Sequence, residues 1–225
     1  MNLAKLVDHT FLKPAGDADA VRKLCREAKE FGFASVCVNP SEVPLAARLL
    51  KRCETKVCTV IGFPLGANTT RVKCFEALDA IGNGADELDF VVNQRLLKYD
   101  PDACGAELAE LAAACRRVRP ETVLKLILEC CNLTKDEIVR GCRLAKKAGF
   151  DFVKTSTGFA AGGATAEDVR LMRKTVGRKM GVKAAGGIRD RATALAMVAA
   201  GATRIGASAG KALLGAVPER QRQGG

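Results

Sequence analysis

The sequence predicts a single parallel (β/α)8 barrel, the TIM-barrel fold of the α/β class, over residues 1–215. A chain of 225 residues suits one such domain. In addition, one unit recurs, in which a helix ends at glycine and an apolar strand begins two or three residues later; it is found at Gly32, Gly84, Gly149 and Gly201. Repeated βα units require parallel strands, and eight close most naturally into a barrel. The alternative is an open doubly wound sheet, but no G-x-G-x-x-G follows the first strand.

The expected strands are short apolar runs, and helices with start signals fill the gaps between them. Asp17 or Asp19 can cap the first helix, and Thr134 with Glu137 forms a capping box for a later one. The tail 216–225 has little to bury and is expected to fray. The strands are expected at about 8–12, 34–39, 56–62, 86–93, 122–129, 151–156, 181–186 and 204–208.

Composition narrows the class of protein. The net charge of +11 invites a nucleic-acid interpretation, but the basic residues are spread along the chain and only 4% of residues are aromatic. A solvated basic surface that favours anionic, phosphorylated substrates is the simpler interpretation. No apolar run approaches the ~20 residues of a membrane span, and the N-terminal sequence MNLAKLVDHTF does not resemble a signal peptide. We therefore expect a cytoplasmic protein that binds neither nucleic acid nor membrane.

The cysteines and the histidine argue against a metal centre. The sequence has ten cysteines but no CxxC pair, and His9 is its only histidine. A Cys/His zinc site therefore has almost no ligands to draw on. We expect reduced thiols that are mostly buried at apolar positions.

Charged residues interrupt strands that should be almost continuously apolar. In a parallel barrel both faces of each strand are covered, so such departures are informative. Period-two alternation allows Asp8, Asp89, Lys125, Lys154 and Lys183 all to face the interior. One interpretation is a structural salt-bridge layer of two carboxylates and three ammonium groups. The other is a catalytic amine.

The residue types in this layer suit amine catalysis. A lysine attacks a carbonyl only as the free amine, so desolvation or a nearby cation must lower its pKa. Lys154 and Lys183 lie on adjacent predicted strands and could form such a pair. Asp89 could then move protons between substrate, water and the carbinolamine. Strand geometry alone leaves open which lysine attacks.

Glycines after strands seven and eight suggest a phosphate site. Gly186 and Gly187 follow strand seven just before a helix, and Gly206 and Ser208 end strand eight. Barrels often bind phosphate in these two loops through backbone N–H groups and a helix N-terminus. A glycine pair in most sequences indicates only a turn. After strand seven of a barrel it predicts phosphate binding.

Eight segments resemble the deoxyribose-phosphate aldolase family, from about residue 3 to residue 215. They are LVDHTFLKP, VCVNP, IGFPLG, GADELDFVVN, LKLILE, FVKTSTGF, VKAAGGIR and RIGAS. The resemblance implies a class I aldolase of deoxyribose phosphate catabolism that acts through a lysine Schiff base, without metal or cofactor. It would reversibly cleave 2-deoxy-D-ribose 5-phosphate to D-glyceraldehyde 3-phosphate and acetaldehyde.

The resemblance also assigns roles. It implies that Lys154 forms the Schiff base, that Lys183 perturbs the pKa of that lysine and transfers protons, and that Asp89 is the proton relay. Asp8 and Lys125 would be supporting residues. Cys37 of VCVNP corresponds to a pocket cysteine, although a simple buried thiol fits it equally well. The implied supporting set is Asp8, Lys125, Cys37 and Thr157.

The chain departs from the family pattern at two places. Some members have a phosphate-binding lysine after KTSTG, whereas this chain has Phe159, so phosphate binding would rest on Gly187, Gly206, Ser208 and backbone groups. Some members also end in a tyrosine that reaches the site, and Tyr99, the one tyrosine here, lies elsewhere.

Two other functions remain open. Another Schiff-base barrel, such as a transaldolase or a ketose-phosphate aldolase, would not use acetaldehyde as donor. A non-catalytic barrel that binds RNA or another polyanion would show a steeply salt-dependent affinity. On general grounds we expect a homo-oligomer, a dimer or a tetramer.

Overall fold

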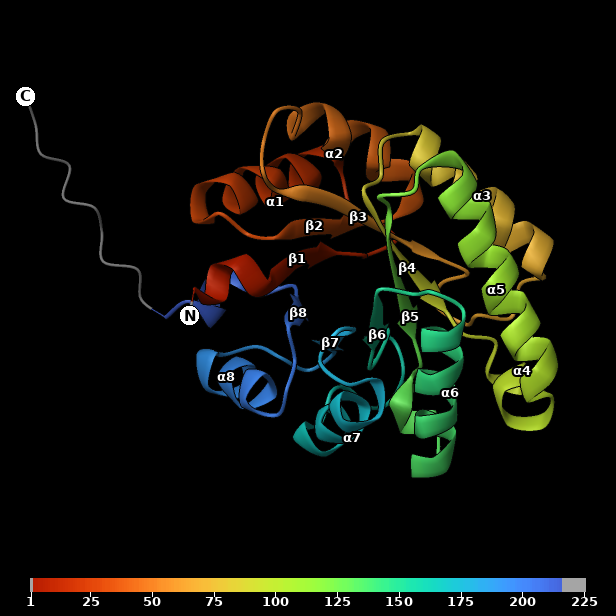
Figure 1. Cartoon of the computed structure of the whole chain (residues 1–225). Helices are drawn as coiled ribbons and strands as arrows, with labels where there is room; N and C mark the ends of the chain where they lie inside the picture. The colour runs from red at the N-terminus through yellow and green to blue at the C-terminus, as the bar shows by residue number, and fades with distance from the viewer. Residues whose placement is uncertain (1, 216–225) are drawn as a thin grey trace, which may run out of the picture.

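Eight parallel strands close into a barrel in the order of the sequence. The computed structural model describes residues 2–215, and within them each strand pairs with its sequence neighbours and β8 closes the ring on β1 (Figure 1). The predicted fold is therefore confirmed. The strands are β1 (Val7–Phe11), β2 (Ser35–Val38), β3 (Lys56–Ile61), β4 (Glu87–Val91), β5 (Val123–Ile127), β6 (Phe152–Lys154), β7 (Gly181–Ala185) and β8 (Arg204–Ala207).

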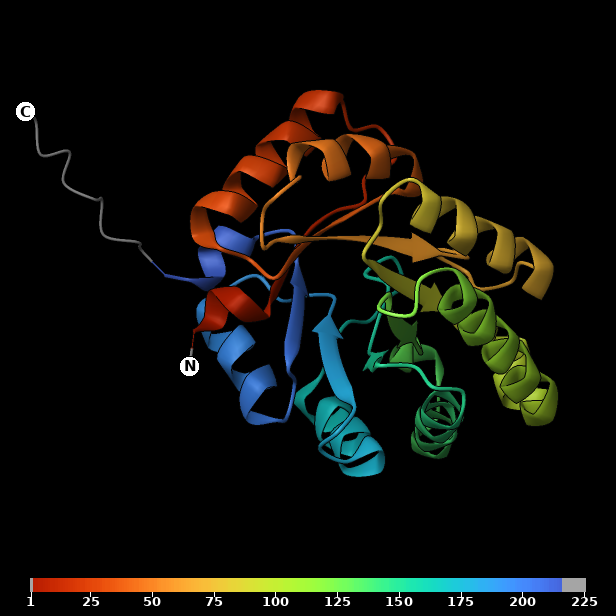
Figure 2. The same cartoon turned by 45° about the horizontal axis from the view of Figure 1, so that its top comes forward.

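Helices surround this ring of strands, as Figure 2 shows. No helix in the described part is long and apolar enough to cross a membrane. The α-helices are α1 (Ala18–Phe31), α2 (Val43–Leu49), α3 (Thr70–Gly82), α4 (Gln94–Tyr99), α5 (Pro101–Val118), α6 (Lys135–Lys147), α7 (Ala166–Val176), α8 (Arg191–Ala199) and α9 (Gly210–Leu213). Short 3-10 turns lie at η1 (Leu3–Leu6), η2 (Pro40–Glu42) and η3 (Cys130–Asn132).

The helix ends follow the sequence signals. Asp17, rather than Asp19, caps α1 by accepting a hydrogen bond from the Ala20 N–H, and Gly32 ends that helix with φ +67°. The capping box of Thr134 and Glu137 at α6 is present in full. These caps satisfy backbone groups that a free helix end would leave unpaired.

The main apolar core lies between the strands and the helices, which fixes the direction of each strand side chain. Leu124 and Leu126 of β5 are fully buried in this core. Alternation therefore places Lys125, between them, on the inner face of the barrel. In the same way His9 of β1 points outward to Glu27 of α1 at 2.8 Å, which leaves Asp8 inside. The apolar core thus positions the charged interior.

Three strands end two residues earlier than predicted. Strand β4 ends at Val91 rather than near 93, β5 at Ile127 rather than near 129, and β6 at Lys154 rather than near 156. Glu129 has a φ of +58° and its carboxylate accepts hydrogen bonds from Thr157, so the chain leaves the sheet early to tie the loops after β5 and β6 together. The expectation for 216–225 concerns residues outside those described.

Candidate active site

Seven charged side chains fill the barrel interior, two more than expected. Four cations face three carboxylates, which leaves one positive charge in excess. Arg204 was missed, although it precedes Gly206 by two residues. Glu87 was left out of the predicted set, although alternation places it on the same face as Asp89. The predicted layer of two carboxylates and three ammonium groups is therefore too small. The set is Asp8, Glu87, Asp89, Lys125, Lys154, Lys183 and Arg204.

Asp89 is the centre of this layer. Its Oδ2 accepts hydrogen bonds from Lys154 Nζ and Lys183 Nζ, each at 2.8 Å, and its Oδ1 accepts one from Lys125 Nζ at 2.8 Å. Burial alone would raise the pKa of Asp89, but the three ammonium groups hold that pKa well below its usual range. Asp89 is therefore a fixed carboxylate in contact with all three interior lysines.

Lys183 is held as an ammonium ion. Burial alone would lower the pKa of Lys183, but Asp8 and Asp89 raise that pKa well above its ordinary value. Asp8 contacts Lys183 Nζ at 2.5 Å and accepts a hydrogen bond from Ser35 Oγ at 2.7 Å. In the resting site Lys183 therefore carries a positive charge beside the Asp89 carboxylate.

Lys125 is similarly enclosed. Its Nζ lies 2.6 Å from Glu87 and 2.8 Å from Asp89, and these carboxylates, with others nearby, overcome the effect of burial and raise the pKa of Lys125. Arg204 reaches Glu87 from the other side at 3.1 Å. Lys125 and Arg204 thus form ion pairs with the carboxylates of the layer.

Lys154 is the interior lysine that reaches open space. It lines a cavity of about 270 Å³ at the carboxyl ends of the strands, while the side chains of Lys125 and Lys183 are fully buried beneath. Phe159 also lines this cavity and packs edge-on against Phe63 at 5.1 Å. Thr157, Gly186, Gly187, Gly206 and Ser208, all expected at the site, lie on its wall. So do the basic residues Lys13 and Arg189, which the sequence analysis did not single out.

The two kinds of glycine on this wall differ. Gly187 has a φ of +78°, and a Cβ there would enter open space, so a ligand can approach its backbone. Gly206 lies within β8 and faces the interior, where a Cβ would stand 3.1 Å from Lys183 Cε. The expectation that Gly206 serves only backbone approach to phosphate is therefore incomplete, because Gly206 also leaves room for the Lys183 side chain.

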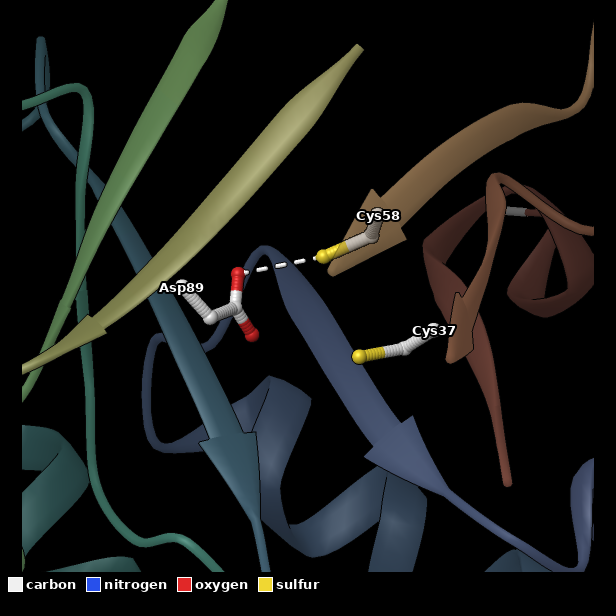
Figure 3. Close-up of side chains that lie close together, drawn as sticks. All are labelled: Cys37, Cys58 and Asp89. Atoms are coloured by element: carbon white, nitrogen blue, oxygen red, sulfur yellow. Dashed lines mark hydrogen bonds between the residues drawn. The ribbon is translucent and has the colours of Figure 1, made fainter. Parts of the chain in front are cut away.

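The supporting residues occupy different places. Thr157 donates through its backbone N–H to Glu129 at 3.2 Å and through its hydroxyl to the same carboxylate, which orders the loop after β6. Cys37 is fully buried on β2 beside Cys58 of β3, as Figure 3 shows with Asp89. Cys37 does not line the cavity.

One group of potential metal ligands occurs within residues 2–215. The thiols of Cys37 and Cys58 and a carboxylate oxygen of Asp89 all lie within 4.8 Å of one another. Both Asp89 oxygens already accept hydrogen bonds from ammonium groups, so a divalent cation would have to sit among three positive charges. The arrangement does not fit a metal ion.

Comparison with known proteins identifies the family. The family model described as "DeoC/LacD family aldolase" matches residues 2–217. The chain is 58% identical over 211 residues to a deoxyribose-phosphate aldolase of Clostridium perfringens (strain SM101 / Type A), covering 94% of this chain and 93% of that protein. It is 52% identical over 225 residues to one from Caldanaerobacter subterraneus subsp. tengcongensis, covering 100% and 96%.

Solved structures agree. The structure described as "QR15, an Aldolase" superposes with a TM-score of 0.88 at 42% identity and covers 95% of this chain and 94% of its own. The deoxyribose phosphate aldolase of Aeropyrum pernix, described as a unique tetrameric structure, gives a TM-score of 0.87 at 34% identity and covers 94% and 89%. With its barrel, its interior lysines and these relatives, the chain belongs to the DeoC/LacD family of aldolases.

Proposed function

We propose that this chain is a deoxyribose-phosphate aldolase that cleaves 2-deoxy-D-ribose 5-phosphate reversibly to D-glyceraldehyde 3-phosphate and acetaldehyde, with Lys154 as the Schiff-base lysine. The observation that carries the proposal is the position of Lys154. Its ammonium group stands between the cavity and the Asp89 carboxylate, 2.8 Å from the latter. Relatives more than half identical over nearly their whole length carry the same activity in their names.

The charge of the layer is the same before and after the covalent step. With all groups ionised the interior holds one excess positive charge. Lys125 and Lys183 keep their protons because buried carboxylates raise the pKa of each. The iminium at Lys154 places the same single positive charge beside Asp89. The covalent intermediate therefore has the charge of the resting layer.

The reaction then follows from the chemistry of a 3-hydroxy iminium. Lys154 Nζ attacks C1 of the open-chain sugar, and the carbinolamine loses water to give the iminium. Removal of the O3 proton breaks the C2–C3 bond, the electron pair passes to the iminium, and glyceraldehyde 3-phosphate leaves. The enamine takes a proton at C2, and hydrolysis releases acetaldehyde. Asp89, with Lys183 beside it, is placed to pass these protons.

The glycine-rich part of the cavity wall suits the phosphate group. The backbone at Gly186 and Gly187, the turn that precedes α8, and Ser208 form it together with Arg189. Backbone N–H groups at a helix start bind phosphate, and an arginine can neutralise part of its charge. We infer that these groups replace the lysine for which this chain has Phe159.

Three further properties are inferred for the enzyme: its independence of a metal or cofactor, its oligomeric state and its location. We infer that catalysis needs no metal or cofactor, because the iminium accepts the electron pair. We also infer a homo-oligomer in the cytoplasm. Ten free cysteines suit a reducing compartment, and the large apolar side chains of Leu65 and Phe75 are exposed on and beside α3.

A cleavage assay tests the proposal. Purified Lys154→Met should lose all measurable release of glyceraldehyde 3-phosphate from deoxyribose 5-phosphate, followed with a coupled dehydrogenase. Lys23→Met, at an exposed lysine of α1, is the matched control and should keep the full rate. A panel of ketose phosphates separates this enzyme from other Schiff-base aldolases. Cleavage of a ketose phosphate in preference to deoxyribose 5-phosphate, or substantial activity of Lys154→Met, would overturn the proposal.

A further inference from the structure

Two cysteines lie side by side on the inner face of the barrel, next to the site. Cys37 of β2 and Cys58 of β3 are register partners and both are fully buried (Figure 3). Neighbouring strands lie about 4.7–4.9 Å apart, which is within the Cα separation that a disulfide spans. Their sulfur atoms lie within 4.8 Å of each other. The pair can therefore form a disulfide without a change of strand register.

The two thiols are chemically unequal. The neighbouring Cys58 side chain lowers the pKa of the Cys37 thiol against the effect of burial, and Lys183 and Lys154 lower it further. Burial, followed by the contact with Cys37, raises the pKa of Cys58 well above its ordinary value. Cys37 is therefore the more acidic thiol of the pair. This is the asymmetry of a nucleophilic and a resolving cysteine.

Cys58 also contacts Asp89. Its Sγ–H donates a hydrogen bond to Asp89 Oδ1 at 3.2 Å, on the oxygen that Lys125 also contacts. Lys125 Nζ in turn donates to the Cys58 sulfur at 3.4 Å. The other Asp89 oxygen is left to Lys154 and Lys183. A disulfide sulfur has no proton to donate, so oxidation of Cys58 would remove one of the four hydrogen bonds of this carboxylate.

We propose that Cys37 and Cys58 form a redox-sensitive dithiol site, in which oxidation by a hydroperoxide to a disulfide slows the aldolase by withdrawing the Cys58 hydrogen bond from Asp89. The effect on rate rests on the proposed role of Asp89, whereas the disulfide itself does not. Cys58 acts here as a positioning residue, since it orients the carboxylate and does not touch the substrate.

The chemistry balances with the peroxide as oxidant. The Cys37 thiolate attacks one peroxide oxygen and the O–O bond breaks. This gives the Cys37 sulfenic acid and, after uptake of a proton, water or an alcohol. The Cys58 thiol attacks the sulfenic sulfur, the S–S bond forms and a second water leaves with the Cys58 proton. Two thiols lose two electrons and two protons, and the peroxide accepts them.

The substrate cavity gives the oxidant its route. Thr10 and Leu12 of the β1 end line that cavity. Thr10 is the register partner of Cys37, and Leu12 packs in a small apolar cluster with Cys37 and Cys58. Hydrogen peroxide is little larger than water, and we expect it to reach Cys37 from the cavity past Leu12.

The experiment uses the whole enzyme with Cys131→Ser, which removes the one exposed cysteine of the ten. The reduced protein is treated with hydrogen peroxide, remaining thiols are alkylated, and peptides are mapped by mass while kcat and KM are measured. We expect a Cys37–Cys58 disulfide and a fall in kcat of at least about tenfold, the lower end of the range expected for loss of a hydrogen bond to a charged group. A reducing dithiol should restore both.

Matched variants separate this site from general oxidation. Adding Cys142→Ser, at a buried thiol of α6, should leave the peroxide response as in the background. Adding Cys37→Ser or Cys58→Ser should abolish the reversible loss of kcat on peroxide treatment. For each variant, kcat after treatment is compared with kcat of the same variant in its reduced form. Cys58→Ser keeps a donor for Asp89 and should have a higher kcat than Cys58→Ala, with a pH profile closer to the background.

Each contrary outcome has a clear meaning. Absence of the Cys37–Cys58 disulfide after peroxide has oxidised other thiols overturns the site. A Cys37–Cys58 disulfide with unchanged kcat overturns its link to Asp89. A reduced protein without aldolase activity defeats the proposed function instead, and the peptide map still reports whether the disulfide forms.

Discussion

Asp89→Asn changes one atom type in the middle of the charged layer, and its effect can be worked out from the contacts. The carboxylate is fully buried and takes hydrogen bonds from three ammonium groups at 2.8 Å. The amide removes the negative charge and points an NH2 group at one of those ammonium ions. The excess charge of the interior rises from one to two. Although asparagine has nearly the same shape as aspartate, we therefore expect the substitution to reduce both the rate and the stability.

The contacts of Asp89 give an expected loss of rate and an expected loss of stability. Loss of a general acid–base group costs about 10²–10⁴ in rate, so we expect kcat for deoxyribose 5-phosphate to fall by at least about 100-fold. Removing one partner of a buried ion pair costs about 3–5 kcal/mol of unfolding free energy. For a protein of this size each kcal/mol lowers Tm by about 2–4 °C, which gives a fall of about 6–20 °C.

The coupled cleavage assay gives kcat, and differential scanning calorimetry gives Tm. Asp79→Asn is the matched control, because Asp79 is exposed on α3 and should change neither quantity measurably. A variant Tm equal to that of the parent would refute the charge layer as described. A large fall in Tm with kcat within tenfold of the parent would make Asp89 a structural counterion instead of a proton relay.

Three further predictions concern pH, the glycines and metals. The pKa of Asp89 is lower in the folded than in the unfolded protein, so its carboxylate stabilises the fold above about pH 4, and this stabilisation is lost as the pH falls through the folded pKa. The pKa values of Lys125 and Lys183 are raised in the folded protein, so their ammonium groups stabilise the fold below about pH 10, and this stabilisation is lost as the pH rises through the folded values. Denaturant melts across pH should therefore show a plateau between these limits, and a steady rise or fall through neutral pH would contradict this. The valine side chain of Gly206→Val would press on Lys183, so this variant should have a lower kcat for deoxyribose both with and without the phosphate. Gly187→Ala should raise KM for the phosphate ester alone. The opposite pattern would make Gly206 the phosphate-binding glycine and Gly187 the one that leaves room for the catalytic lysines. Dialysis against EDTA should leave activity intact, and loss restored by a divalent ion would contradict an iminium electron sink.

Strand periodicity was enough to predict the barrel and most of its interior. In ELDFVVN the apolar residues Leu88 and Phe90 belong to the outer core, so Asp89 between them had to face inward. Alternation likewise placed Lys125, Lys154 and Lys183 inside the barrel, with Lys154 and Lys183 on adjacent strands. The strand register then pairs Lys125 with Asp89 and Lys154 with Lys183. A buried charge on a short strand is conspicuous because its neighbours are apolar.

Other features depend on tertiary distances that periodicity does not contain. Arg204 was overlooked because a cation at the start of a strand normally lies at the solvent edge, whereas here Asp8 and Glu87 draw it inward. Lys73 of α3 is fully buried and its Nζ lies 2.9 Å from Glu107 of α5. This ion pair was not predicted, because polar residues are common on helices and one buried lysine does not stand out in a helix sequence. The exposure of Lys154 rather than Lys183 to the cavity depends on side-chain packing around the lumen.

The most direct test of the central claim is to trap the covalent intermediate. The protein is incubated with acetaldehyde, reduced with borohydride, digested and mapped by mass spectrometry for an ethyl group on a lysine Nζ. We predict the ethyl group on Lys154, because Lys154 lines the cavity and the other two interior lysines are fully buried and do not line it. Recovery of the label chiefly on Lys183 or Lys125, or no acetaldehyde-dependent label in an active preparation, would contradict it.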